Sequence, residues 1–297
     1  FWILGRAMKL KKGHVETFKC SFTQQDFDRF ADLTGDNNPI HVDPEFSART
    51  HFGRTVAHGM LLYSTICRVL STRYPGPGTL QTKQDMMFQN PTYTDTEITI
   101  NIEVIDVELL RQRAKLNTMI SLPDGKLACN GGTALHLPGW QGGFPGIDAS
   151  MASAGESEAQ SLKRLQVGQS AAAKRIFTDR DLAAYADLTK DTNPLFNDAV
   201  FARQQGFKDC IIPGPLLSGM FSDLLGTKLP GRGTNWLKQK LHFPAPAYIG
   251  DEITARVEIV RLRPEKDLVN LIGTCTNSDG EWVCQAQSLV LVRELEE

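Results

Sequence analysis

The chain has 297 residues, a length that accommodates two domains of ordinary size. Its composition is typical of a globular protein, with 41% hydrophobic and 22% charged residues. The formal net charge of -2 gives no electrostatic reason to expect nucleic acid or an anionic membrane as a partner. No apolar run approaches the roughly 18 to 20 residues that span a bilayer.

The cysteines and the start of the chain bear on localisation. No C-x-x-C pair occurs among the six cysteines, which is typical of free thiols in a reducing compartment. The residues from Phe1 to Ala7 precede Met8, a candidate natural start, and they are too short and wrongly ordered for a signal peptide. The sequence therefore predicts a cytoplasmic protein.

The first elements of the chain lead into a turn rich in polar residues. Residues 15–21 alternate and suit a short strand, and Thr23 is in position to cap a helix that follows it. Residues 34–41 then read TGDNNPIH, in which glycine, asparagine and proline all favour loop backbone. A second short helix is predicted over residues 44–50, with Pro44 at its first position.

A central helix and four strands complete this part of the chain. Apolar residues recur from Val56 to Leu70 at steps of four and three, which predicts a helix that ends near residues 74–78. Strands are predicted over residues 79–88, 97–107, 114–122 and 126–137, with a hairpin turn at Asp124 and Gly125.

The chain repeats itself. When residues 22–103 are laid on residues 177–258 without a gap, 31 of the 82 positions are identical. The second copy has its helix over residues 211–229 and strands over 236–243, 253–263 and 282–292. We therefore predict two units, residues 8–137 and 170–297, joined by a linker over residues 138–169 that has little to bury. Each unit is predicted to be α+β, with a curved antiparallel sheet wrapped around a central helix.

Three residues of the first unit suggest chemistry. Asp36 and His41 place a carboxylate and an imidazole five residues apart in a turn, and Gly59 stands at the mouth of the apolar helix. A carboxylate and an imidazole that share a water can act as acid and base, while a helix N-terminus with a small residue offers an N–H to a developing oxyanion. We expect Asp36 and His41 to be catalytic and Gly59 to be the oxyanion site.

The same residues resemble the signature of a known family. The run from Asp36 to His41, DNNPIH, is followed eighteen residues later by Gly59 in AHGM, a pattern similar to that of the MaoC-like, (R)-specific enoyl-CoA hydratases, or hydratase 2. The resemblance extends from about residue 22 to residue 292. It implies the hot-dog fold, here in its tandem (double) form.

The resemblance also implies a reaction. Asp36 and His41 would activate one water, and the Gly59 N–H would polarise the thioester carbonyl of a trans-2-enoyl-CoA, so that (R)-3-hydroxyacyl-CoA forms; the reverse dehydration is equally expected. His58 and Asn38 are further candidates for the oxyanion and substrate-binding site. The plainer interpretation is that Asn38 forms the turn and that His58 caps the helix.

The second unit departs from this pattern. It keeps Asp191 and Asn193, but Phe196 stands where His41 stands, and Pro213 replaces His58. Without the imidazole, this unit is expected to be catalytically degenerate. In two-copy eukaryotic members of the family the active half is the C-terminal one, whereas here the motif lies in the N-terminal half. We expect the second unit to be a structural partner that completes the acyl or CoA groove.

Other functions stay open at this point. The alternatives are a dehydratase acting on chains bound to a carrier protein, an acyl thioesterase of the same fold, and a non-catalytic acyl-CoA-binding module. No cofactor is expected. No metal is expected either, because the spacing of His51 and Asp43 relative to Asp36 and His41 selects no metal geometry. The expected partner is acyl-CoA, without nucleic acid or membrane. Two fused units already resemble a dimer, so a monomer and a homodimer of fused units are both compatible with the sequence.

Overall fold

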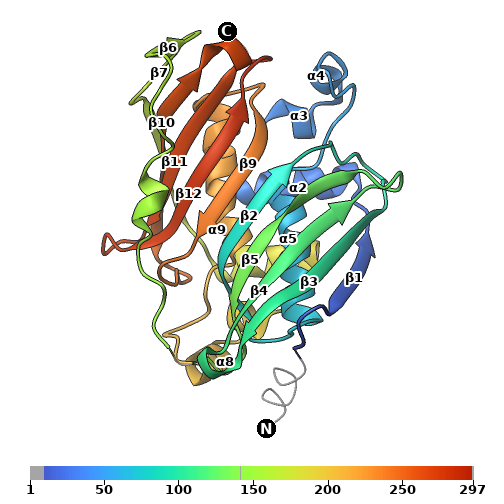
Figure 1. Cartoon of the computed structure of the whole chain (residues 1–297), viewed down its shortest axis with the longest axis vertical. Helices are drawn as coiled ribbons and strands as arrows, with labels where there is room; N and C mark the ends of the chain where they lie inside the picture. The colour runs from blue at the N-terminus through green and yellow to red at the C-terminus, as the bar shows by residue number, and fades with distance from the viewer. Residues whose placement is uncertain (1–9, 141, 296–297) are drawn as a thin grey trace.

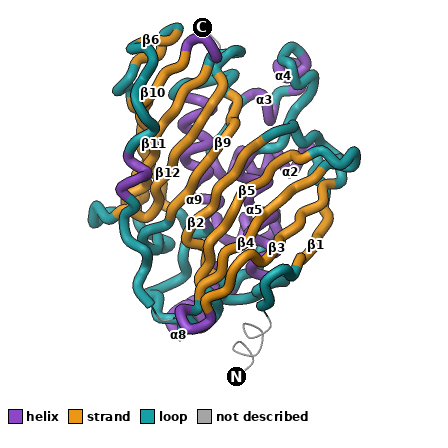
Figure 2. Tube along the Cα trace, in the orientation of Figure 1, coloured by secondary structure: helices purple, strands orange, loops and turns teal. Residues whose placement is uncertain are grey.

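A computed structural model describes residues 10–140 and 142–295 of the chain. Met8 and the residues from Phe1 to Ala7, which entered the prediction of a natural start, lie outside this part. The main feature is an antiparallel sheet of ten strands in the order β1-β3-β4-β5-β2-β9-β12-β11-β10-β8 (Figure 1). Helices gather on one face of this sheet, as the purple segments in Figure 2 show.

The first unit contains every strand and helix that its sequence predicts. Its strands are β1 (Val15–Cys20), β2 (Leu80–Phe88), β3 (Ile98–Glu108), β4 (Arg113–Ser121) and β5 (Leu127–His136). Its helices are α2 (Gln24–Thr34), α3 (Pro39–Val42), α4 (Pro44–Ala48) and α5 (Gly59–Thr72), with a 3-10 turn η1 (Leu109–Arg111) between β3 and β4. Thr23 caps α2 as predicted: its hydroxyl accepts from the Asp26 N–H, and the Asp26 carboxylate accepts from the Thr23 N–H.

The second unit repeats this order. Its strands are β8 (Ser170–Ile176), β9 (Asn235–His242), β10 (Glu252–Arg263), β11 (Leu268–Thr276) and β12 (Trp282–Leu291). Its helices are α6 (Asp179–Thr189), α7 (Pro194–Asn197), α8 (Ala199–Gln204) and α9 (Gly214–Asp223), followed by a π-helical turn η3 (Leu224–Lys228) and a 3-10 turn η4 (Pro264–Lys266). Strand β2 pairs with β9, so the two sheets continue into one.

Both central helices are shorter than predicted. Helix α5 begins at Gly59 because the residues before it are held in extended backbone: Val56 bridges to Tyr93, and the Ala57 N–H donates to the Thr92 carbonyl at 2.8 Å. In the second unit Ile211 forms the corresponding bridge to Tyr248, and α9 starts after it. A glycine N-terminus is therefore set at the same place in both units.

The two central helices pack against each other under the sheet. Met60 and Tyr63 of α5, and Leu216 and Phe221 of α9, are fully buried. They belong to one hydrophobic core that includes residues from both units. Burial of this shared apolar surface holds the units together and fixes the distance between the turn that carries Asp36 and the helix of the other unit.

The linker is more structured than predicted. Residues 138–169 contain a 3-10 turn η2 (Ala149–Ala152) and a small sheet of β6 (Ser161–Leu162) and β7 (Leu165–Gln166). Met151, Leu162 and Leu165 are buried. Most of the described residues in this stretch are nevertheless exposed, as expected of a linker, and its few buried apolar residues fasten it to the second unit.

Strands β5 and β2 approach each other closely at a glycine. A Cβ atom on Gly131 would lie 1.8 Å from the carbonyl oxygen of Asp85, whereas one on the neighbouring Gly132 would lie 3.7 Å from the nearest atom. We expect Gly131→Ala to push the strands apart and to lower the free energy of unfolding by about 1–3 kcal/mol. Urea unfolding measures this, with Gly132→Ala as the control. Equal midpoints for the two variants would contradict the close approach.

Candidate active site

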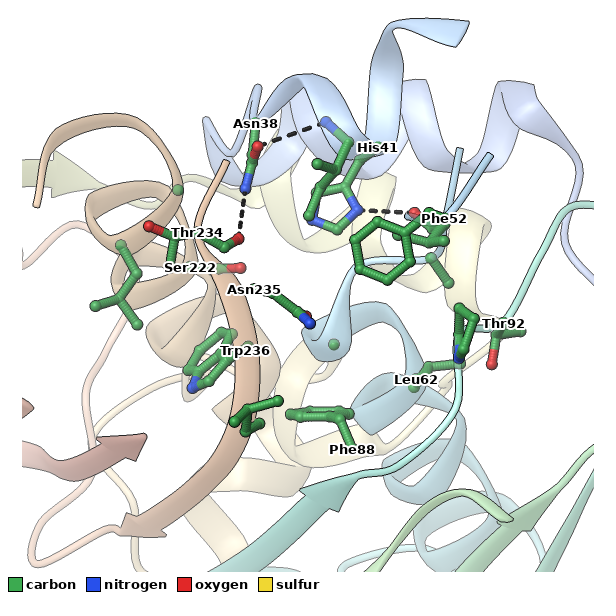
Figure 3. Close-up of a pocket in the computed structure, with 18 of the residues that line it drawn as sticks. Asn38, His41, Phe52, Leu62, Phe88, Thr92, Ser222, Thr234, Asn235 and Trp236 are labelled. Carbon is green, nitrogen blue, oxygen red and sulfur yellow. Dashed lines mark hydrogen bonds between the residues drawn. The ribbon is translucent and has the colours of Figure 1, made fainter. Parts of the chain in front are cut away.

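A cavity of about 250 Å³ lies where the two units meet. Figure 3 shows its walls: His41, Phe52, Leu62 and Phe88 come from the first unit, and Ser222, Asn235 and Trp236 from the second. Asp36 and Gly59 also line it. The structure therefore brings the two predicted catalytic residues and the predicted oxyanion glycine into one cavity, and it adds a wall that the motif of the first unit does not contain.

Asp36 is a buried carboxylate whose two oxygens are both hydrogen-bonded. Helix α2 ends at Gly35, which adopts the left-handed conformation (φ +86°) and turns the chain so that Asp36 enters the interior. The Asn38 N–H donates to Oδ1 at 3.2 Å, and the Ser222 hydroxyl donates to Oδ2 at 2.5 Å. Only 1% of Asp36 is exposed. Its orientation is therefore fixed by its own turn and by the central helix of the other unit.

His41 faces the cavity as a neutral base. Its Nδ1 lies 2.7 Å from the carbonyl oxygen of Val56, so Nδ1 carries the proton and donates it, and Nε2 keeps its lone pair. Burial lowers the pKa of His41 below its usual 6.5, and the neighbouring Asp36 carboxylate opposes that effect. Asp36 and His41 thus combine a hydrogen-bond-anchored carboxylate with an available imidazole nitrogen.

His58 lies behind His41 and is absent from the cavity wall. The two rings stack with centroids 3.9 Å apart, and the His58 Nε2–H donates to the backbone carbonyl of Asp36 at 3.0 Å. Burial, followed by the proximity of His41, holds the pKa of His58 well below 6.5. The His58 side chain makes no capping hydrogen bond to α5. A neutral His58 therefore joins the Asp36 turn to the ring of His41.

Gly59 presents a backbone N–H at the N-terminus of α5. Within the described residues this N–H has no hydrogen-bond acceptor, as expected for the first turn of a helix. A Cβ at this position would lie 2.7 Å from Cζ of Phe88, so a side chain would close the space in front of the N–H. The position offers the end of a helix dipole and a free donor to an oxygen in the cavity.

Asn38 joins the units. Its side-chain Nδ2 donates to the carbonyl oxygen of Thr234 at 3.3 Å, a bond drawn in Figure 3. The second unit repeats this bond from Asn193 to the carbonyl of Thr79 at 2.9 Å. Because the same bond occurs in both units, it explains why both keep the asparagine. The binding role expected for Asn38 remains a prediction, and its amide N–H is already committed to the second unit.

The cavity wall from the second unit was not predicted. Ser222 aligns with Cys67 in the repeat, and Asn235 aligns with Leu80, so neither belongs to a shared motif. In the sequence, the only indication of this wall was the expectation that the second unit completes the groove. His51, weighed above as a metal ligand, also lies at this cavity, and its Nδ1 pairs with Glu294 at 2.9 Å.

The corresponding position in the second unit is nearly filled. Asp191 is held by the Ser71 hydroxyl, and Phe196 lies beside it where the first unit has His41. The cavity here is about 40 Å³. Burial raises the pKa of Asp191 to about 6, against which the hydrogen bond from Ser71 acts. The degenerate character expected for this unit remains a prediction, and the site around Asp191 has no imidazole.

One group of side chains has the composition of a metal site. Asp36, His41 and His58 each offer a ligand atom, and these atoms lie within 4.8 Å of one another. Several atoms of this group are engaged with protein groups: Ser222 and the Asn38 N–H bond the carboxylate, and His58 Nε2 bonds the Asp36 carbonyl, whereas His58 Nδ1 has no partner within the described residues. The expectation that the site works without a metal stays a prediction.

Two twisted antiparallel sheets joined edge to edge, each packed on a central helix, define the double hot-dog class. A solved MaoC-like dehydratase matches the chain with a TM-score of 0.74 and 18% identity, over 96% of this chain and 99% of that one. A conserved hypothetical protein from Mycobacterium tuberculosis with a double hotdog fold matches with a TM-score of 0.73 and 16% identity, over 96% and 97% of the two chains. The predicted fold is confirmed.

The family follows from the sequence comparisons. The model of the MaoC like domain matches residues 7–122 and again residues 163–279, so the chain belongs to the MaoC-like family. The (R)-specific enoyl-CoA hydratase of Aeromonas caviae is 38% identical over 130 residues, 44% of this chain and 97% of the relative. A mitochondrial 3-hydroxyacyl-acyl-carrier-protein dehydratase of Solanum lycopersicum is 36% identical over 141 residues, 47% of this chain and 84% of the relative.

These relatives confirm the predicted family and its enzyme class, the hydro-lyases. Each relative has about the length of one unit of this chain. No helix in the described part of the chain is both long and apolar enough to cross a membrane.

The buried histidines make stability depend on pH. Because folding depresses the pKa of His58, the unfolded state binds a proton below pH 6.5 that the folded state excludes. Relative to His58→Gln, the wild-type protein should therefore lose stability as the pH falls below 6.5, with a slope approaching about 1.4 kcal/mol per pH unit. Urea unfolding of both proteins between pH 5 and 8 measures this difference.

Asp191 should change the stability of the protein with pH in the opposite direction. Its pKa is raised from 3.8 to about 6, so its contribution to stability is present at low pH and is lost as the pH rises through 6. Relative to Asp191→Asn, the wild-type protein should gain stability as the pH falls from 7 to 5. Parallel pH profiles for the wild type and both variants would contradict the burial of these groups as described.

Proposed function

We propose that the chain catalyses the (R)-specific hydration of trans-2-enoyl-CoA to (R)-3-hydroxyacyl-CoA and the reverse dehydration. One observation carries this proposal: the buried Asp36–His41 pair shares a cavity with the unpaired N–H of Gly59. Hydration of a thioester-conjugated double bond needs a base for water, an acid for the α-carbon and a donor for the enolate oxygen. The names of the relatives support hydratase or dehydratase chemistry on acyl thioesters.

The placement of these groups supports the following reaction. The thioester oxygen accepts from the Gly59 N–H, and a water binds between the Asp36 carboxylate and His41 Nε2. The pair removes a proton from this water as its oxygen bonds to the β-carbon, and the electrons of the double bond move onto the thioester oxygen. The helix N-terminus stabilises that charge. The pair then returns the proton to the α-carbon, so that one water is added in full.

The geometry supports both substituents reaching the same face of the substrate. Asp36 and His41 lie on one wall of the cavity, and both hold the same water in this mechanism. Hydroxyl and proton therefore come from one side. The low pKa of His41 keeps Nε2 unprotonated at neutral pH, which is the form that can accept a proton from water.

A dehydratase that acts on carrier-bound chains is the second candidate. The Solanum lycopersicum relative is named for that activity, and its identity to this chain is close to that of the hydratase. The two activities share the chemistry of the cavity and differ in the group that carries the thioester. Comparison of kcat/KM for crotonyl-CoA and for crotonyl on an acyl carrier protein separates them.

The catalytic pair is tested by substitution. We expect Asp36→Asn and His41→Ala each to lower kcat/KM for crotonyl-CoA by a hundredfold or more, because each removes an acid/base group. Loss of the conjugated enoyl absorbance follows the reaction. Asp191→Asn is the matched control, since it makes the same change in the second unit. Unchanged rates in Asp36→Asn and His41→Ala would refute the assignment, and release of free thiol by the wild type would indicate a thioesterase.

The bond between the units is tested at Ser222. Removal of a hydrogen bond to a buried charge costs about 1.5–3 kcal/mol, so we expect Ser222→Ala to lower kcat by roughly ten- to a hundredfold as Asp36 loses its anchor. The matching change, Ser71→Ala, removes the hydroxyl that holds Asp191 and should leave kcat near the wild-type value. Similar losses in the two variants would mean that the serines act only through the stability of the interface.

A further inference from the structure

A carboxamide from the second unit points into the cavity. Asn235 is the first residue of β9, and Figure 3 shows its side chain directed into the space between His41, Trp236 and Phe88. It approaches from the wall opposite the catalytic turn. Nothing in the motif of the first unit or in the mechanism above gives this group a role.

The other side-chain amides on the cavity wall are all engaged. Asn38 donates to the Thr234 carbonyl at 3.3 Å, Gln89 donates to Asn130 at 2.7 Å, and Asn90 donates to the Leu127 carbonyl at 2.8 Å. Of these four side-chain amides, only that of Asn235 has no hydrogen-bond partner within residues 10–140 and 142–295. A partly buried amide that faces a cavity keeps its hydrogen-bonding capacity for water or for a ligand.

The repeat shows that the fold does not require this amide. The position equivalent to Asn235 is Leu80, which faces the nearly filled cavity of the other unit. The threonines that precede these two residues also differ in their hydrogen bonding. The Thr79 hydroxyl donates to the Gly76 carbonyl at 2.6 Å, whereas the Thr234 hydroxyl is buried without a partner. Thr234 and Asn235, which lie near Asp36 and His41, thus carry unpaired polar groups. The equivalent residues of the first unit, Thr79 and Leu80, carry none.

The backbone of Asn235 is held in place. Its neighbour Thr234 accepts the hydrogen bond from Asn38, in the turn that carries Asp36. Strand β9 pairs with β12 at this position, where Asn235 lies opposite Leu291. The backbone that carries the carboxamide is therefore set in register with the turn of Asp36, as a group that orients a ligand needs to be.

We propose that the Asn235 carboxamide is a substrate-binding group that donates a hydrogen bond to a substrate oxygen other than the thioester carbonyl held by Gly59. This inference rests on the proposed function. Two sources of that oxygen are consistent with the cavity: the 3-hydroxyl of the hydrated acyl group, or an amide carbonyl of the pantetheine arm. The second unit would then recognise the ligand as well as complete the wall.

Binding of two thioesters that cannot be hydrated tests the proposal. The dissociation constants of butyryl-CoA and (R)-3-hydroxybutyryl-CoA are measured by calorimetry in the Asp36→Asn background, in which the hydroxyacyl ligand is not dehydrated. They are compared with Asn235 intact and with Asn235→Leu, which installs the residue of the other unit. We expect a loss of about five- to tenfold, the value of one hydrogen bond. A loss for both ligands identifies the pantetheine arm, and a loss for the hydroxyacyl ligand alone identifies the 3-hydroxyl.

Controls separate binding from folding. Asn235→Asp keeps the shape of the side chain, removes its N–H donors and adds a negative charge. If the substrate oxygen is a carbonyl, it should lose at least as much affinity as Asn235→Leu, whereas a 3-hydroxyl can donate to the new carboxylate and should recover part of the loss. Asn117→Leu makes the same change on an exposed position of β4 and should bind as the wild type does. Unchanged dissociation constants in both Asn235 variants would overturn the proposal.

The outcome is independent of the hydration assay. A wild type that binds both thioesters but hydrates no enoyl-CoA would refute the proposed function and leave the role of Asn235 to be decided by the dissociation constants. A wild type that hydrates crotonyl-CoA, together with dissociation constants that do not change when Asn235 is substituted, would refute this inference alone.

Discussion

A carboxylate buried at the junction of two folded units is the constraint on which this site depends. Asp36 is almost inaccessible to water, so its charge must be compensated by hydrogen bonds, and one of these comes from Ser222 in the other unit. The shared hydrophobic core holds α9 where that hydroxyl can reach the carboxylate. The surroundings of the Asp36–His41 pair therefore depend on both units, and neither unit alone contains the cavity.

The two units have diverged by small exchanges around this arrangement. Each aspartate accepts from a serine of the opposite central helix, but the two serines are not equivalent: Ser222 aligns with Cys67, and Ser71 aligns with Gly226. A Cβ on Gly226 would lie 2.9 Å from Oδ1 of Asp36, so the glycine leaves room for this carboxylate. In the other unit, Phe196 aligns with His41 and lines a cavity of about 40 Å³, whereas the cavity beside Asp36 is about 250 Å³. One cavity is therefore open and its counterpart is nearly filled.

Much of this arrangement can be predicted from the sequence, and the limits have physical causes. The repeat, the strand pattern and the spacing of Asp36, His41 and Gly59 are local properties, and the structure brings these three residues to one cavity. Ser222 and Asn235 could not be found in that way, because their positions relative to Asp36 depend on how two sheets join edge to edge. The apolar stripe that starts at Val56 extends beyond α5 for a similar reason, since Val56 is held in extended backbone by a bridge to the distant residue Tyr93.

The stereochemical course of hydration in heavy water tests the central claim most directly. If Asp36 and His41 hold one water and return its proton from the same wall, crotonyl-CoA in D2O should give (R)-3-hydroxybutyryl-CoA with a single deuterium at the α-carbon, added on the same face as the hydroxyl. Chiral chromatography and proton NMR of the product determine both centres. An (S) product would contradict the proposed (R) specificity, and deuterium on the opposite face would contradict a single water activated by this pair.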